Sequence, residues 1–129
     1  LCQPLVNLGI DYFSHIRVDS SNQITGITNH PEYFKHYFEN NFQNVDLSSC
    51  DIAPTTRYIL WDQIKLSGRA EALYLSSRAF DLAYTFTICD NNGHEQNFYN
   101  FEAHVAKSWI KEFYFTHIDL LEHFINYYK

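Results

Sequence analysis

Hydrophobic and polar residues alternate along the first part of the chain, as they do in β-strands. Residues 12–18 alternate and include β-branched side chains, and residues 24–28 form a similar run after the polar residues 19–23. Two such runs joined by a short polar turn predict a β-hairpin. Ahead of this hairpin, residues 1–8 predict the end of a helix, with Gly9 as its stop signal.

A helical pattern follows the predicted hairpin. Asn29 is expected to cap this helix, with Pro31 in the first turn and Glu32 three residues after the cap. Tyr33 and Tyr37 lie four residues apart and therefore share one helical face. A neighbouring face carries three further aromatic residues: Phe34, Phe38 and Phe42. A helix that is aromatic over so wide an arc is expected to be buried on more than one side.

The second half of the chain repeats the alternation of helical and strand patterns. In order, it predicts a loop at 45–57, a short strand at 58–61, a helix at 67–82, strands at 84–89 and 95–101 around a turn at 90–93, and a long helix at 108–129. The apolar stripe of the last helix consists of Phe113, His117, Leu120, Leu121, Phe124 and Tyr128. Hairpins with helices between them predict an α/β fold: an α-β-α sandwich with a central antiparallel sheet of about five strands flanked by helices, PAS/GAF-like.

Composition limits the class of protein. A length of 129 residues fits one domain, residues 1–129, and 46% hydrophobic residues suffice for one core. The aromatic share of 18% is compatible with an internal cavity, or with aromatic rings that simply fill the core. The formal charge of −6 and the absence of a basic cluster argue against direct binding of nucleic acid by this segment.

Cysteine and histidine positions predict neither a disulfide framework nor a metal site. Cys2, Cys50 and Cys89 are widely spaced, which favours a reducing cytoplasm. The histidine pairs lie six residues apart, which does not suit ligands on one helical face. No run of apolar residues predicts a membrane span. Phosphate-binding and serine-nucleophile motifs are missing, so no enzyme activity and no cofactor are expected.

One group of residues has the chemistry of a ligand site. Tyr33 and Tyr37 offer phenol groups, Asp46 offers a carboxylate just beyond their helix, and Trp61 offers an indole N–H next to Asp62. Hydroxyl and indole donors suit ligand carbonyl groups, while a carboxylate suits a ligand N–H. The alternative for Asp46 is a solvated loop residue or a helix-end cap.

Residues 28–46 resemble the central motif of LuxR-type acyl-homoserine-lactone receptors. That motif contains an Asn-Tyr-Pro turn, then Trp, a Tyr four residues later, another aromatic residue and an Asp. Tyr37, Phe42 and Asp46 fall at the family spacing. Tyr33 takes the place of the family Trp.

The resemblance covers residues 10–101. Trp61 follows Asp46 at the family distance, and residues 84–89 resemble the family's Gly-x-Thr-x-Pro strand. Departures from the family pattern, besides Tyr33, are Leu47 in place of Pro, Thr85 in place of Gly and Cys89 in place of Pro.

The resemblance implies a role for each candidate site residue. Asp46 would accept a hydrogen bond from the amide N–H of the signal, and Tyr37 would donate to its amide carbonyl. Trp61 would donate to the lactone carbonyl, Tyr33 would pack against the ring or chain, and Tyr99 on the last strand would line the cavity.

The resemblance also implies partners: a small amphipathic signal, a second copy of the chain in a homodimer, and DNA through a helix-turn-helix domain that follows Lys129 and is absent here. The alternative is a ligand-free PAS-like or LuxR-sensor-like dimerisation module whose aromatic residues fill the cavity. A third interpretation, an enzyme, requires convergent titratable groups in an open cleft.

Overall fold

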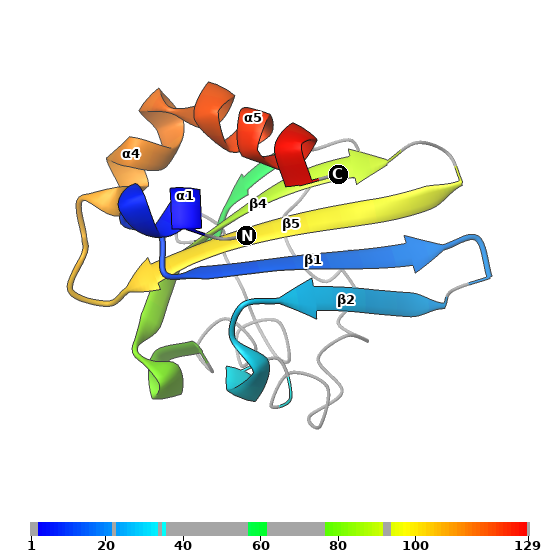
Figure 1. Cartoon of the computed structure of the whole chain (residues 1–129), viewed down its shortest axis with the longest axis horizontal. Coiled ribbons are helices and arrows are strands. Elements are labelled where there is room, and N and C mark those ends of the chain that lie inside the picture. Colours follow the sequence, from blue (N-terminus) through cyan, green and yellow to red (C-terminus); the bar gives the residue numbers. More distant parts are fainter. Residues whose placement is uncertain are drawn as a thin grey trace.

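A five-stranded antiparallel sheet forms the centre of the molecule in the computed structural model, which describes residues 3–21, 23–33, 35, 57–61, 77–91 and 94–128. The strands are β1 (Tyr12–Asp19), β2 (Ile24–Thr28), β3 (Tyr58–Leu60), β4 (Leu82–Asn91) and β5 (Glu95–His104). Their order across the sheet is β2-β1-β5-β4-β3 (Figure 1). The predicted fold class, with its central antiparallel sheet and helices, is confirmed.

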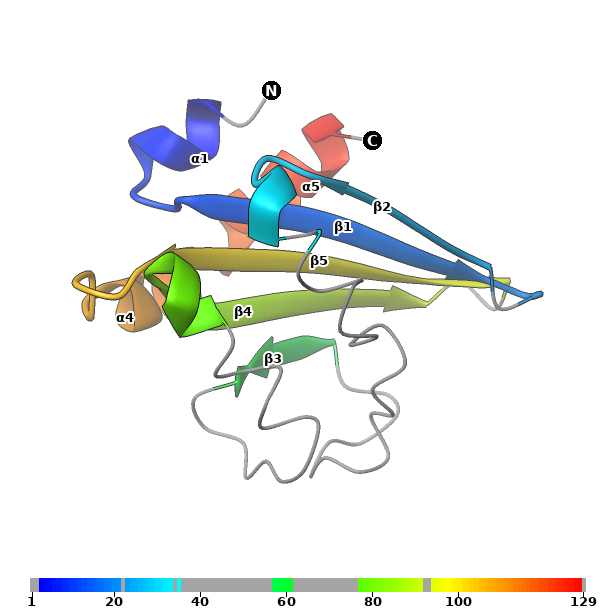
Figure 2. The same ribbon diagram turned by 90° about the horizontal axis from the view of Figure 1, so that it is seen from below.

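Helices lie on both sides of this sheet. Three of them, α1 (Gln3–Asn7), α4 (Ile110–Thr116) and α5 (Ile118–Tyr128), cover the face that we call the upper face (Figure 1). The helical residues 31–33 and 35 and the 3₁₀ helix η4 (Ser77–Phe80) lie on the opposite, lower face (Figure 2). No helix in the described part of the chain is long and apolar enough to cross a membrane.

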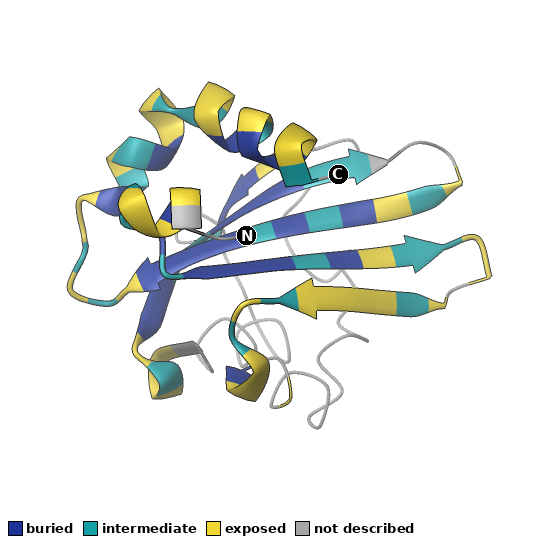
Figure 3. Ribbon diagram, in the orientation of Figure 1, coloured by how far each residue is buried: buried dark blue, intermediate teal, exposed yellow. Residues whose placement is uncertain are grey.

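The main hydrophobic core lies between the upper face and its helices (Figure 3). Successive side chains of a strand point to opposite faces, so every second residue enters this core. From the sheet come Phe13, Phe86, Ile88, Tyr99 and Phe101, and from α5 come Leu121, Phe124 and Ile125. Aromatic rings meet edge to face within it, as Phe13 does with Phe124 at 5.2 Å between centroids.

A β-bulge in β4 changes which residues point to the lower face. Ala83 pairs with Ala103 and Phe86 pairs with Phe101, so two residues of β4 stand opposite the single residue Glu102. The backbone of Tyr84 has a φ of 58° at this point.

The structure has two helices in place of the single helix predicted at 108–129, because the helix is interrupted at His117. The backbone of His117 has φ −130° and ψ 32°, which is not helical. Just before it, Thr116 Oγ1 donates back to the carbonyl oxygen of Glu112 at 3.0 Å, a bond that competes with regular helix geometry. The apolar stripe continues across the break, and Leu120 within it is 40% exposed rather than buried.

Two other predictions about helix ends need correction. Asn29 does not cap the helix that follows it; its Oδ1 accepts from the backbone N–H of Phe13 at 2.9 Å, and His30 Nδ1 accepts from the N–H of Tyr33 at 3.2 Å. The prediction of a helix at 67–82 is wrong at its end, where η4 ends at Phe80 and β4 begins at Leu82. The prediction for residues 67–76 lies outside the described residues. Gly9 ends the turn after α1 at a φ of 92°, as predicted.

Candidate functional site

A row of hydrogen bonds crosses the lower face of the sheet. The indole Nε1–H of Trp61 donates to Thr87 Oγ1 at 2.9 Å, and the Thr87 hydroxyl donates to Asn100 Oδ1 at 2.7 Å. Asn100 Nδ2 then donates to Ser14 Oγ at 3.0 Å. These four residues, which we call the polar row, come from β1, β5, β4 and the residue after β3. Ser14 and Thr87 are each only 1% exposed, so their hydroxyl groups depend on these protein partners.

An aromatic cluster occupies another part of the same face. Tyr33 contacts Tyr12 at 5.1 Å and Phe80 at 5.2 Å between ring centroids, and Phe80 contacts His30 at 5.7 Å. Tyr12 and Tyr33 are buried, together with Leu82. Tyr12 precedes Ser14 by two residues on β1, so the aromatic cluster lies one pleat away from the polar row.

The bulge in β4 brings these two features to one face. Leu82 and Thr87 are five residues apart, and a regular strand would place their side chains on opposite faces. The additional residue in the bulge places both of them on the lower face. The lower face therefore combines a buried apolar surface with a small set of directional hydrogen-bonding groups, as small-molecule sites do.

The sequence-predicted site residues fall into three groups. Tyr33 and Trp61 lie on the lower face, in the aromatic cluster and the polar row. Tyr37 and Asp46 lie outside the described residues. Tyr99 points to the upper face, where it is 2% exposed and stacks on His15 with ring centroids 4.5 Å apart. The structure therefore separates Tyr99 from the face that holds the other two.

Three members of the polar row were not predicted: Ser14, Thr87 and Asn100. Each is a polar residue in the interior of a strand, with apolar or aromatic neighbours on at least one side in the sequence. A polar side chain that is buried at such a position costs free energy unless it is hydrogen-bonded. It therefore indicates a hydrogen-bonding partner on the buried face of the strand. That pattern is the signal from which the row is recognisable in the sequence.

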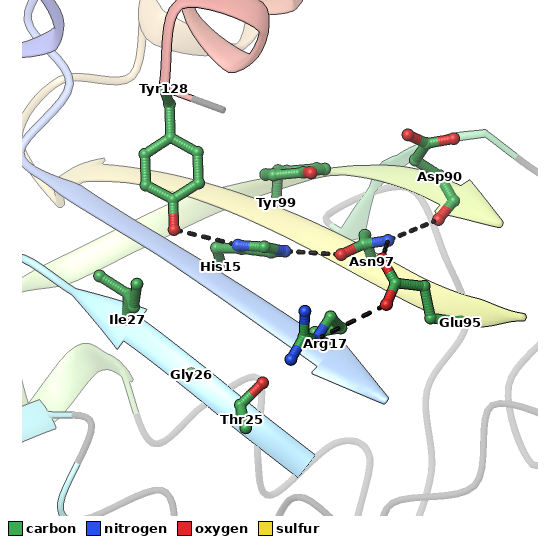
Figure 4. A pocket seen from close by; sticks show the side chains of 10 residues that line it. All are labelled: His15, Arg17, Thr25, Gly26, Ile27, Asp90, Glu95, Asn97, Tyr99 and Tyr128. Carbon is green, nitrogen blue, oxygen red and sulfur yellow. Dashed lines mark hydrogen bonds and ion pairs between the residues drawn. The ribbon is translucent and has the colours of Figure 1, made fainter. Parts of the chain in front are cut away.

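A groove of about 740 Å³ lies on the upper face, beyond the end of α5 (Figure 4). It is lined by His15, Arg17, Thr25, Gly26, Ile27, Asp90, Glu95, Asn97, Tyr99 and Tyr128. Its polar groups bind one another: His15 Nδ1 contacts the Tyr128 hydroxyl at 3.0 Å, and His15 Nε2 contacts Asn97 Oδ1 at 2.7 Å. Tyr99 belongs to this groove, where burial, followed by the nearby Asp90 carboxylate, raises the pKa of its phenol to about 12.

Metal-binding and redox groups contribute little to either face. Among the described residues, no group of three or more His, Cys, Asp and Glu side chains is arranged to hold a metal ion. Cys89 is a free thiol two residues from Thr87 on β4, and burial raises its pKa to about 11. A thiol with so high a pKa is a poor nucleophile at neutral pH.

Comparison with known proteins identifies the fold. Residues 1–97 match the family model of the autoinducer-binding domain. No curated protein sequence matches the chain. Escherichia coli SdiA is similar in structure, with a TM-score of 0.63 and 21% identity over 79% of this chain and 45% of the SdiA chain. SdiA in complex with octanoyl-rac-glycerol gives a TM-score of 0.62 and 20% identity, over 79% and 44% of the two chains.

The chain thus spans less than half the length of these SdiA chains, and the low identity makes the likeness one of fold. The family match is independent of that likeness and extends over most of the chain. Domains of this family are signal receptors and not enzymes. The chain belongs to the autoinducer-binding domain family, the signal-receptor part of LuxR-type quorum-sensing regulators.

Proposed function

We propose that this domain binds a small amphipathic signal, an acyl-homoserine lactone or another acylated molecule, against the lower face of the sheet. The observation that carries the proposal is the polar row beside the aromatic cluster on one buried face. Aromatic surface suits an acyl chain, and fixed donors and acceptors suit a polar head group. A structure of SdiA in complex with octanoyl-rac-glycerol extends the candidate signals beyond lactones.

Four residues carry the proposed contacts. Trp61 donates its indole N–H to a carbonyl of the signal, and Tyr33 packs against the acyl chain or ring. Tyr37 donates to the amide carbonyl, and Asp46 accepts from the amide N–H; these two roles rest on the family resemblance. Because Trp61 already donates to Thr87, the signal carbonyl has to share or take over this bond. Tyr99 faces the groove on the upper face, so we leave it out of the proposed lower-face site.

The domain is proposed to act in the cytoplasm as part of a homodimeric transcription regulator. With a formal charge of −6, this segment is poorly suited to bind DNA directly, so DNA contact is assigned to a separate domain. One observation supports the alternative of a ligand-free dimerisation module: the residues of the polar row satisfy one another's hydrogen bonds without any ligand.

Thermal melting with a panel of compounds tests the proposal. The panel contains acyl-homoserine lactones of several chain lengths, octanoyl glycerol and unrelated aryl amides. A signal at a free concentration one hundred times its Kd adds about 2.7 kcal/mol to the free energy of unfolding, which raises the Tm by several degrees. Asp46→Ala removes the proposed acceptor for the amide N–H, and Asn100→Ala disrupts the polar row that orients Thr87 and Trp61; each should abolish the shift.

Asn97→Ala in the upper groove is the matched control, because it removes the same amide group from the other face of β5. It should lower the Tm of the free domain without abolishing the shift. A shift that is lost in Asn97→Ala and kept in Asp46→Ala and Asn100→Ala would contradict the lower-face site. The absence of a shift with every compound would favour the dimerisation module.

A further inference from the structure

Arg57 connects the beginning of β3 to two other elements. Its Nη2 donates to both carboxylate oxygens of Glu122 on α5, at 2.7 and 2.8 Å. Its Nη1 donates to the carbonyl oxygen of Cys89 on β4 at 3.0 Å, and its own carbonyl accepts from the N–H of Cys89 at 2.6 Å. Nη1 also lies 3.8 Å from Asp90 Oδ1. One side chain thus joins β3, β4 and the last helix.

The other end of the same short strand carries Trp61. β3 has only three residues, Tyr58–Leu60, and Trp61 follows it directly. Arg57 and Trp61 are therefore four residues apart along an extended segment, a separation of about 13 Å. Between them, Ile59 and Leu60 are 2% and 5% exposed, so the segment is anchored in the packed interior.

β3 is the shorter of the two edge strands of the described sheet, with three residues against five in β2. It pairs only with β4 within that sheet. An edge strand is held by hydrogen bonds on one side, whereas an inner strand is held on both sides. β3 therefore joins Trp61 at one end to Arg57 at the other, and Arg57 contacts α5.

The contact between Arg57 and Glu122 fixes the position of α5 more than it adds to the free energy of unfolding. Arg57 and Glu122 have side-chain exposures of 43% and 29%, and ion pairs so exposed add little to the free energy of unfolding. Nη2 nevertheless reaches both oxygens of Glu122 while Nη1 of the same planar guanidinium donates to the Cys89 carbonyl, so the group is fixed relative to both α5 and β4. α5 has a second polar contact with the sheet, between Tyr128 and His15, six residues further along the helix. The two contacts hold α5 to two different strands.

We propose that Arg57 is a positioning residue that couples the placement of Trp61 on the lower face to the placement of α5 on the upper face. In a signal receptor, this coupling conveys to the last helix whether the lower-face site is occupied. This part of the inference rests on the proposed function. The coupling between Trp61 and α5 is a property of the ligand-free domain and is measurable without any signal.

The test observes Trp61 while the far end of the connection is changed. Trp109→Phe leaves Trp61 as the one indole in the chain, and its ¹H–¹⁵N resonance reports the hydrogen bond to Thr87. Glu122→Gln, on the other side of the sheet, should move this resonance upfield. It should also speed exchange of the indole proton about two- to tenfold, as a weakened hydrogen bond does. The Tm should change little.

Asp119→Asn is the matched control, since it removes one negative charge from an exposed position on the same helix. It should leave the Trp61 resonance in place. Arg57→Lys keeps the charge and loses the planar group that binds Glu122 and the Cys89 carbonyl at once, so it should move the resonance in the same direction as Glu122→Gln. The double variant Arg57→Lys/Glu122→Gln should match the larger single effect and not the sum, because both changes act through one contact.

Two results would overturn the coupling. One is a Trp61 resonance that stays in place in folded Glu122→Gln and in folded Arg57→Lys. The other is an equal shift in Asp119→Asn and Glu122→Gln, which would indicate a general effect of charge. Because no compound is added, failure to find a signal in the melting experiment leaves this result unaffected. If Glu122→Gln does not fold, Arg57→Lys alone decides the outcome.

Discussion

The two faces of the sheet are built from the same strands by different means. On β1, Phe13 points up into a core of aromatic and aliphatic side chains, and its neighbour Ser14 points down into the polar row. Both residues are 1% exposed. The core on the upper face is therefore held by apolar contacts, whereas the lower face adds a few directional hydrogen bonds to its smaller aromatic cluster.

This difference separates the source of stability from the source of specificity. Dispersion contacts and apolar burial are nondirectional and add up over a large area, so the upper core sets most of the free energy of unfolding. Buried hydrogen bonds contribute less net energy, but they fix the orientation of each group. A receptor needs the first property to keep its fold and the second to choose its ligand.

Substitution of adjacent residues on β1 gives the largest expected contrast between the faces. Phe13→Ala should cost about 3–5 kcal/mol of unfolding free energy, because it removes a ring packed against Phe101 and Phe124. Ser14→Ala should cost about 1–2 kcal/mol, because it removes one acceptor of the polar row. Urea unfolding measures both. Equal losses would show that the two faces contribute to stability in the same way.

The thiol of Cys89 gives a second contrast, through its reactivity. Burial raises its pKa from 9.0 to about 11, so at pH 8 it should react with iodoacetamide about one hundredfold more slowly than the same thiol in urea. Between pH 9 and about 11 the unfolded chain releases this proton and the folded chain keeps it, so stability should fall over that range. The substitutions Cys2→Ser and Cys50→Ser leave Cys89 as the one thiol that can react. Equal rates in the two states would show that Cys89 is open to solvent.

Substitution in the middle of the polar row is expected to lower the free energy of unfolding by less than Phe13→Ala does. Thr87→Val keeps the shape of the side chain and removes the hydroxyl that accepts from Trp61 and donates to Asn100, at an expected cost of about 1–3 kcal/mol. Thr87→Ser keeps the hydroxyl and is the matched control, with a smaller loss. Chemical unfolding of both variants provides the comparison. A Val variant as stable as the Ser variant would mean that the row adds nothing to stability.

The strands were predictable because their pattern is local. Alternation at 12–18 and 24–28 and the turn at 90–93 reflect which side chains a pleated strand buries, and the structure places β1, β2 and the β4–β5 hairpin there. The family resemblance added the expectation for Trp61 and Tyr33, which the structure places on one face.

Other features depend on contacts that a local pattern does not contain. The break at His117 was missed because the apolar stripe runs through it, and the bond from Thr116 that accompanies the break is a detail of geometry. Asn29 was expected to cap a helix, but it binds the backbone of Phe13, a residue sixteen positions earlier in the chain. Only the tertiary arrangement decides between such partners.

Tyr99 and its neighbour Asn100 show that adjacent residues on a strand face opposite sides of the sheet. Tyr99 was expected in the ligand cavity from its place on the last strand, yet its neighbour Asn100 is the residue that joins the polar row. A shift of one position exchanges the two faces of a strand, so the register decides which of these two neighbours faces the polar row. Pairing across the sheet, which the sequence does not display, settles the choice.

The bulge at Tyr84 and Thr85 has a consequence for how related sequences are aligned and redesigned. Its additional residue reverses the parity of β4, so that residues on either side of it are not related by simple alternation. A relative with one residue fewer at this point would expose a different set of side chains to its ligand, even with every flanking residue identical. Gaps placed here therefore determine which positions are compared between receptors, and a one-residue deletion is a more radical change than most substitutions.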